Sequence, residues 1–316
     1  MAIKSRLLAA ALAGGLAISS QVSFAAPIVG WSIDLSGLNG TVQGGVTYNG
    51  FGTLTDLQDI AINGQSRVVQ EIDSTTGSGV GKTFWDSGFL NWTGAKKSNG
   101  TAVGTGTFAS FLGSNDSTPD NFIYWEFVSL TGTGLAGGDV SFDTGAAQLG
   151  TVKWYLDKDS RALSDVALST GGAHPAADVA GTSPASRLEL ASFSVVPLSG
   201  GSGISVDGGA FPSGTFGLSL DVDSLLAGVV IKDDNGNVLN TDATLQFVDV
   251  DATLTANAVT FENGSGSFVN GDTYFVANPI DNEGSFLPQT VPEPASLVML
   301  GGGLLAFGAA RRRKTA

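Results

Sequence analysis

Residues Thr215–Val222 read TFGLSLDV and alternate strictly between apolar and small or polar side chains. A period of two is the pattern of a β-strand with one buried and one solvated face. Leu218 is therefore predicted to face a core, and Ser219 to face solvent.

A second strand is predicted over residues 121–130, where both alternating sets are mostly apolar. Such a strand belongs at the centre of a sheet or under cover on both faces. The Asn235-Gly236 dipeptide between two apolar runs predicts a hairpin at Asp233–Asn237, because this pair accepts positive φ in tight turns. Further strands are predicted at residues 152–156, 188–196, 245–250, 258–261 and 273–277.

The fold class expected from these segments is all-β, as an antiparallel β-sandwich or jelly roll. The 45 glycines fit a protein with many tight turns. A helical period outside the two termini is brief, near residues 54–61 and 160–168. We expect residues 26–290 to form one extracytoplasmic domain.

The first 25 residues have the composition of a secretory signal peptide. Lys4 and Arg6 precede an uncharged apolar run at residues 7–18, and Ser23-Phe-Ala25 supplies small residues for signal peptidase. We expect a signal helix there and cleavage after Ala25.

The last residues, 291–316, have three parts in a fixed order. The tripeptide Pro292-Glu293-Pro294 is followed by an uncharged stretch at residues 295–310 and then by a basic cluster. As a helix that stretch would reach about 24 Å, slightly short of a hydrocarbon core of roughly 30 Å but able to span it with local thinning. The positive-inside rule keeps the cluster cytoplasmic and places the body outside. The basic residues are Arg311, Arg312, Arg313 and Lys314.

This ending resembles the PEP-CTERM sorting signal. The resemblance implies that a membrane enzyme, exosortase, cuts at or near Pro292-Glu293-Pro294 in a Gram-negative host that makes an exopolysaccharide matrix. It implies a chain anchored transiently in the inner membrane and then placed on the cell surface or in the extracellular matrix. A plain membrane anchor is the alternative.

The body is strongly acidic and lacks cysteine. All 29 acidic residues lie between Ala26 and Pro294, whereas six of the 15 basic residues lie in the terminal segments. Nucleic acid is excluded as a partner, because the dominant electrostatic term would be repulsive. Without cysteine there is no thiol chemistry and no disulfide, although an exported chain could form one.

Three aromatic segments are similar to those of flocculation-associated PEP-CTERM proteins: residues 122–127, 154–157 and 271–275. This resemblance implies association with exopolysaccharide in flocs or biofilm, and it supplies no catalytic residue.

Enzymatic chemistry has few candidates. The single histidine, His174, lies in a Gly- and Pro-containing loop, without the other imidazoles that a zinc site usually needs. Glu126 and Glu189 lie within apolar strands, where two facing carboxyls could hydrolyse a glycosidic bond. They could equally face solvent or pair with a base such as Arg187 or Lys153.

Calcium is a candidate ligand because the chain is rich in loop carboxylates. The acid pairs considered are Asp157 with Asp159, and Asp233 with Asp234; turn or solvent-face acids are the alternative reading. None fits an EF-hand loop. Two further pairs share the same one-residue spacing: Asp221 with Asp223, and Asp249 with Asp251.

Trp85 and Trp92 lie in the densest aromatic segment, residues 84–92. Their rings could stack on sugars or pack in the core.

Two functions remain from the sequence. The first is a non-catalytic surface or matrix protein that associates with exopolysaccharide. The second is a secreted carbohydrate-active enzyme or a calcium-dependent carbohydrate-binding module. A cleft with two facing carboxyls would favour the enzyme, and a filled core with only shallow surfaces would favour the matrix protein.

Overall fold

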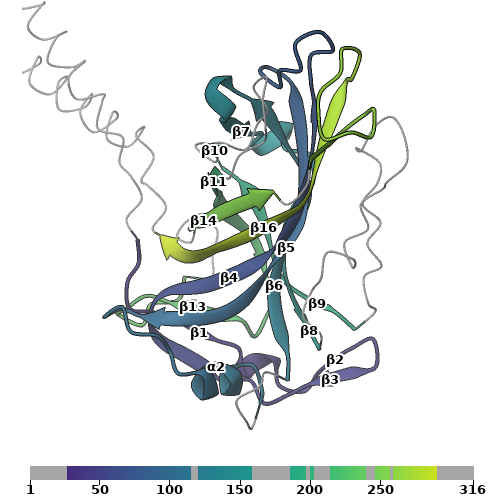
Figure 1. Ribbon diagram of the computed structural model, residues 1–316. Helices are drawn as coiled ribbons and strands as arrows, with labels where there is room; N and C mark the ends of the chain where they lie inside the picture. The colour runs from purple at the N-terminus through teal and green to yellow at the C-terminus, as the bar shows by residue number, and fades with distance from the viewer. Residues whose placement is uncertain are drawn as a thin grey trace, which may run out of the picture. The chain divides into compact units, whose positions relative to one another are not determined.

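The computed structural model describes residues 27–114, 120–158, 186–196, 200–202, 214–239, 246–256 and 259–289. Residues Pro27–Gln289 belong to one compact unit, built mostly of antiparallel strands (Figure 1). The predicted signal helix, the predicted transmembrane helix and the helical candidate at residues 160–168 lie outside the described residues. No helix within the described ranges is long and apolar enough to span a membrane.

The first half of the unit carries the longest strand, β4 (Thr53–Glu71). The strands of this half are β1 (Trp31–Asp34), β2 (Thr41–Gln43), β3 (Val46–Tyr48), β4, β5 (Thr83–Lys97), β6 (Phe122–Gly134), β7 (Val140–Phe142) and β8 (Thr151–Asp157). Short helical turns connect some of them: η1 (Ser36–Leu38), α2 (Thr105–Phe111), η2 (Ala136–Gly138) and η3 (Gly145–Ala147).

The second half returns along the same sheet. Its strands are β9 (Leu188–Val195), β10 (Gly200–Ser202), β11 (Gly214–Gly217), β12 (Ser219–Leu225), β13 (Val230–Lys232), β14 (Gln246–Ala256), β15 (Val259–Phe261) and β16 (Tyr274–Gln289). The predicted strands are confirmed, with the residue 215–222 segment divided between β11 and β12. Leu218 is buried, and Ser219 is partly exposed.

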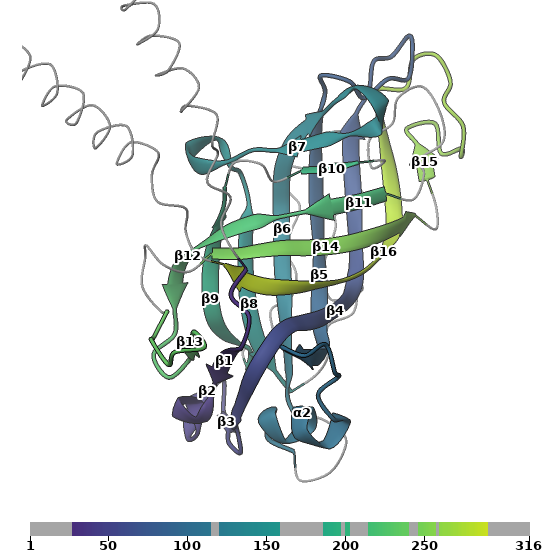
Figure 2. The same cartoon turned by 90° about the vertical axis from the view of Figure 1, so that its left-hand side faces the viewer.

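The all-β antiparallel class is confirmed, but the strands do not form the two separate sheets of a sandwich. All described strands except the β2–β3 hairpin join one 14-stranded sheet. Its pairings run from β6 through β8, β9, β12, β14, β16, β4 and β5 back to β6. The sheet is therefore curled, and β11 and β14 face β5 and β6 across the interior (Figure 2).

Long, bent strands explain why one sheet replaces two. β4 and β5 approach each other closely at Gly64 and Gly88, where a Cβ atom would collide with the backbone of Phe89 and of Gln65, respectively. Glycine in a strand marks such a bend. Each strand can therefore turn a corner without leaving the sheet.

The helical prediction at residues 54–61 is wrong, because this segment begins β4. Its backbone pairs with both β5 and β16, so tertiary pairing overrides the local pattern. The hairpin at Asp233–Asn237 is confirmed: the Asp233 N–H donates to the Asn237 carbonyl at 3.0 Å. Of its two central residues only Gly236 has a positive φ.

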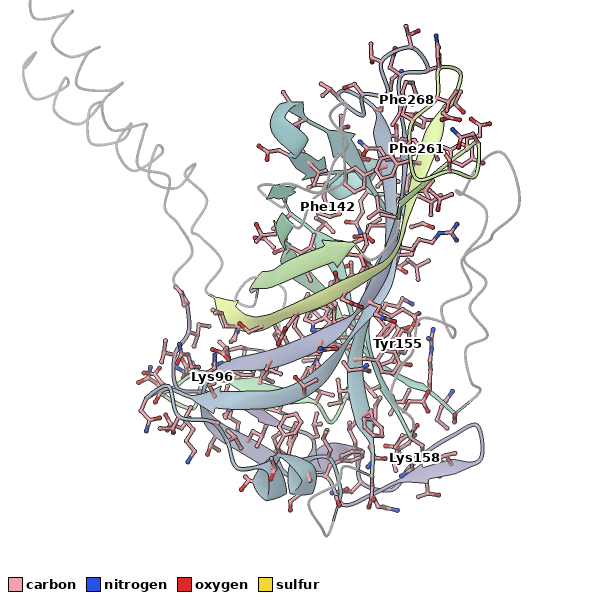
Figure 3. The ribbon with its side chains drawn as sticks, viewed as in Figure 1. Lys96, Phe142, Tyr155, Lys158, Phe261 and Phe268 are labelled. Atoms are coloured by element: carbon pink, nitrogen blue, oxygen red, sulfur yellow. The ribbon has the colours of Figure 1, made fainter. Side chains whose placement is uncertain are left out.

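The interior is filled by large aromatic side chains. The ring of Trp154 packs edge-on against Trp125 and Trp92, with centroid distances of 4.9 and 5.2 Å. Phe193 of β9 and Phe286 of β16 close the cluster from the other strands. A smaller aromatic contact joins Phe261 and Phe268 near β15, at the other end of the sheet (Figure 3).

Candidate functional site

The outer face of β6, β8 and β9 carries the two glutamates that the sequence singled out. Glu126 accepts a hydrogen bond from Arg187 Nη1 at 2.7 Å, and both side chains are about nine-tenths buried. The guanidinium also lies 3.6 Å from the centroid of the ring of Tyr155, which is labelled in Figure 3. Burial alone would lower the pKa of Arg187, but the Glu126 hydrogen bond and charge outweigh it and raise the pKa.

Glu189 belongs to a second, more exposed pair on the same face. Lys153 Nζ donates to Glu189 Oε2 at 2.7 Å, and this hydrogen bond raises the pKa of Lys153. Each glutamate is thus held by one of the two bases proposed as its partner. The geometry matches ion pairing, because each carboxylate accepts a hydrogen bond from a cationic side chain.

A shallow groove of about 260 Å³ lies beside these pairs, between the β7–β8 connection and strands β8, β9 and β12. Its polar lining includes Gln148, Lys153, Ser194 and Asp223. The Ser194 hydroxyl donates to the Asp223 carboxylate at 2.8 Å. Gln148 Oε1 accepts from the Val195 N–H at 2.7 Å, which fixes the connection against β9.

Hydroxyl, amide and carboxylate groups in an open groove can hydrogen-bond a polyhydroxylated ligand. Sequence reasoning missed this groove, because its residues come from three separate segments of the chain. The alternation of Ser192, Ser194 and Asp223 with apolar residues is the signal that could have pointed to a polar outer face.

Trp85 and Trp92 are both buried, at 9% and 4% exposure. Trp92 packs against Trp154 and Phe286 in the interior. The packing of Trp92 corresponds to the core-packing alternative.

The acid pairs proposed for calcium have local partners where they are described. Asp233 accepts hydrogen bonds from the Asn237 side chain and from the N–H groups of Asn237 and Asn235, and these bonds lower the pKa of Asp233. Asp234 Oδ1 accepts from Asn235 Nδ2. These contacts use the carboxylates of Asp233 and Asp234 as hydrogen-bond acceptors within the Asp233–Asn237 turn.

Asp157 is buried and accepts from the Lys158 N–H at 2.7 Å, while Asp159 lies outside the described residues. Asp221 and Asp223 lie on β12, and the side chains of Asp249 and Asp251 are not described. Within the described ranges no three His, Cys, Asp or Glu residues come together as a metal centre. His174 also lies outside these ranges.

Asp86 is a buried acid that the sequence reasoning missed. It lies on β5 opposite Val68 and Leu130, which both belong to the interior cluster. Burial raises the pKa of Asp86 to about 7, and hydrogen bonds from Ser66 and Ser87 offset this only in part. An aspartate in an otherwise apolar strand segment was the available signal.

The sorting segment follows directly on the last strand. Pro292, Glu293, Pro294 and the basic residues Arg311, Arg312, Arg313 and Lys314 lie outside the described residues. β16 ends at Gln289, and its Pro288 carbonyl accepts from the Ile28 N–H at 2.9 Å.

Comparison with known proteins identifies only this terminal segment. Residues 290–314 match the family model of the PEP-CTERM protein-sorting motif. No curated protein and no solved structure matches the chain. The chain therefore carries a PEP-CTERM protein-sorting motif, and the match begins at the residue that follows its last strand.

Proposed function

We propose that this protein is a non-catalytic component of the cell surface or extracellular matrix that associates with exopolysaccharide in flocs or biofilm. The observation that carries the proposal is the PEP-CTERM motif at residues 290–314, which implies export, exosortase as the processing partner and sorting toward the cell surface. Signal peptidase acts at the other end, after Ala25.

A non-catalytic role is supported by how the body uses its candidate residues. The aromatic side chains that could wall a sugar cleft fill the interior instead. Glu126 and Glu189 are each held in an ion pair. Within the groove, Asp223 is a single carboxylate whose two oxygens both accept from Ser194.

Exopolysaccharide association is supported by the polar groove and by the charge of the body. Neutral or cation-bridged polysaccharides suit an acidic protein better than polyanions do. Gln148, Ser194 and Asp223 line the same groove, so it is the proposed contact surface.

Deletion of the gene tests the biological role. We expect flocs or biofilm to weaken while exopolysaccharide output stays unchanged. Loss of the polysaccharide itself would instead indicate a role in its synthesis, and unchanged flocs would contradict the proposal.

Binding tests the groove separately. The purified protein should sediment with the host's exopolysaccharide, and Asp223→Ala with Ser194→Ala should reduce the bound fraction several-fold. Asp139→Ala removes an exposed acid in the turn that precedes β7, outside the groove lining, and should leave binding unchanged. Equal binding by both variants would exclude the groove.

A further inference from the structure

The last strand remains paired up to the point where the sorting motif begins. Gln289, Pro288 and Leu287 of β16 are in register with Gln246, Phe247 and Val248 of β14. The family match begins at residue 290, so no linker separates the folded sheet from the motif.

The other end of the body lies at the same corner. Ile28 donates its N–H to the Pro288 carbonyl, and the Gly30 N–H donates to the Leu57 carbonyl at 2.8 Å. A Cβ atom at Gly30 would lie 3.2 Å from the Asp234 Cβ, so the Asp233–Asn237 turn borders this corner. Val29, between these two anchored residues, is 48% exposed.

The tether between this corner and the sorting tripeptide is very short. Three residue steps from Gln289 to Pro292 span at most about 11 Å when fully extended. A compact unit as long as residues 27–289 has a radius of gyration of roughly 18 Å. An enzyme that reaches Pro292 must therefore come within about 11 Å of the corner, a distance shorter than this radius of gyration.

We propose that the corner formed by residues 27–30, the Asp233–Asn237 turn and the end of β16 is a docking surface for the membrane enzyme that processes the tail. This inference rests on the proposed processing at Pro292-Glu293-Pro294. The occupant is the processing enzyme itself, because the tether leaves no room for it to reach the tripeptide without lying against this surface. In the alternative, the end of β16 unpairs from β14, the tether becomes longer, and the enzyme reaches the tripeptide without touching the corner.

A bulky adduct at the corner tests the proposal. The chain has no cysteine, so Val29→Cys provides a single labelling site. Val269→Cys is the matched control, because Val269 is 55% exposed and precedes β16 at its opposite end. Each full-length precursor is labelled with maleimide-polyethylene glycol, checked for an unchanged melting temperature, and incubated with host membranes that contain the processing enzyme.

We expect the adduct at residue 29 to slow appearance of the processed form at least tenfold and the adduct at residue 269 to change it less than twofold. A flexible insert of twenty Gly and Ser residues after Gln289, which lengthens the tether to roughly 26 Å, should restore processing of the residue 29 adduct. Equal rates for the two adducts would overturn the docking surface and favour unpairing of β16.

Replacement of Pro292, Glu293 and Pro294 by alanine separates this outcome from failure of the proposed function. If that variant is still processed, the tripeptide is not the signal and the proposed processing fails. If it is not processed while both adducts are processed normally, only the docking surface fails.

Discussion

Trp92 and Asp86 lie six residues apart on β5 and face the same interior, yet their surroundings differ. Trp92 contacts the rings of Trp154 and Phe286. Asp86 faces Val68 and Leu130, and its Oδ1 has no hydrogen-bond partner among the described residues. The interior thus contains both an aromatic cluster around Trp92 and, six residues away on the same strand, a buried acid.

Glu126 extends this comparison to the outer face. It is as buried as Asp86, but it has Arg187 as a partner at 2.7 Å. No ion pair is recorded for Asp86 in the described part of the chain. Because a buried charge without a partner is costly, Asp86 lowers the cost by holding a proton, whereas Glu126 has a guanidinium instead.

The largest effect is expected from Trp154→Ala. Trp154 is fully buried and contacts Trp92, Trp125, Phe193 and Phe286, so truncation should lower the free energy of unfolding by about 3 to 5 kcal/mol. Val42→Ala, at a site that is 61% exposed, should change it by less than about 0.5 kcal/mol. Denaturant titration measures both, and similar values would mean that the aromatic cluster does not hold the fold.

Asp86 should make stability depend on pH. Its folded pKa of about 7 lies above the ordinary value of 3.8, so the folded state binds the proton more tightly than the unfolded state. The contribution of Asp86 to the free energy of unfolding should therefore be greatest below about pH 4. It should fall by up to roughly 4 kcal/mol as the pH rises to about 7.

Asp86→Asn removes this proton equilibrium and is the direct check on it. The difference in unfolding free energy between the variant and the original protein should grow in favour of the variant from pH 4 to pH 8. A difference that stays constant over this range would show that Asp86 is ionised in the fold.

The two outer-face ion pairs should differ because they differ in burial. Glu126→Ala leaves Arg187 buried without its partner and should cost about 3 kcal/mol. Glu189→Ala breaks a pair whose side chains are 29% and 42% exposed, and it should cost less than about 1 kcal/mol. Equal costs in urea titrations would contradict the burial of the Glu126 pair.

Local sequence patterns predicted the strands well, because alternation and turn residues act within a few positions. The Thr215–Val222 segment, the Asn235-Gly236 turn and the terminal sorting motif all carry their signal in fewer than 30 residues. The buried Leu218 follows from the period of two alone.

Contacts between distant segments could not be predicted in this way. Glu126 and Arg187 are 61 residues apart. From the sequence, an ion pair with Arg187 was only one of several possible roles for Glu126. The curled single sheet depends on the register of β4, β5 and β16, which no local pattern contains. The brief helical period at residues 54–61 was overridden by that same pairing.

Mass spectrometry of the protein recovered from the host's cell surface and medium is the decisive measurement of the proposed sorting. The account predicts a mature chain that begins at Ala26, ends at or near Pro292-Glu293-Pro294, and lacks peptides from residues 295–316. A surface form that retains residues 295–316 in full would contradict it.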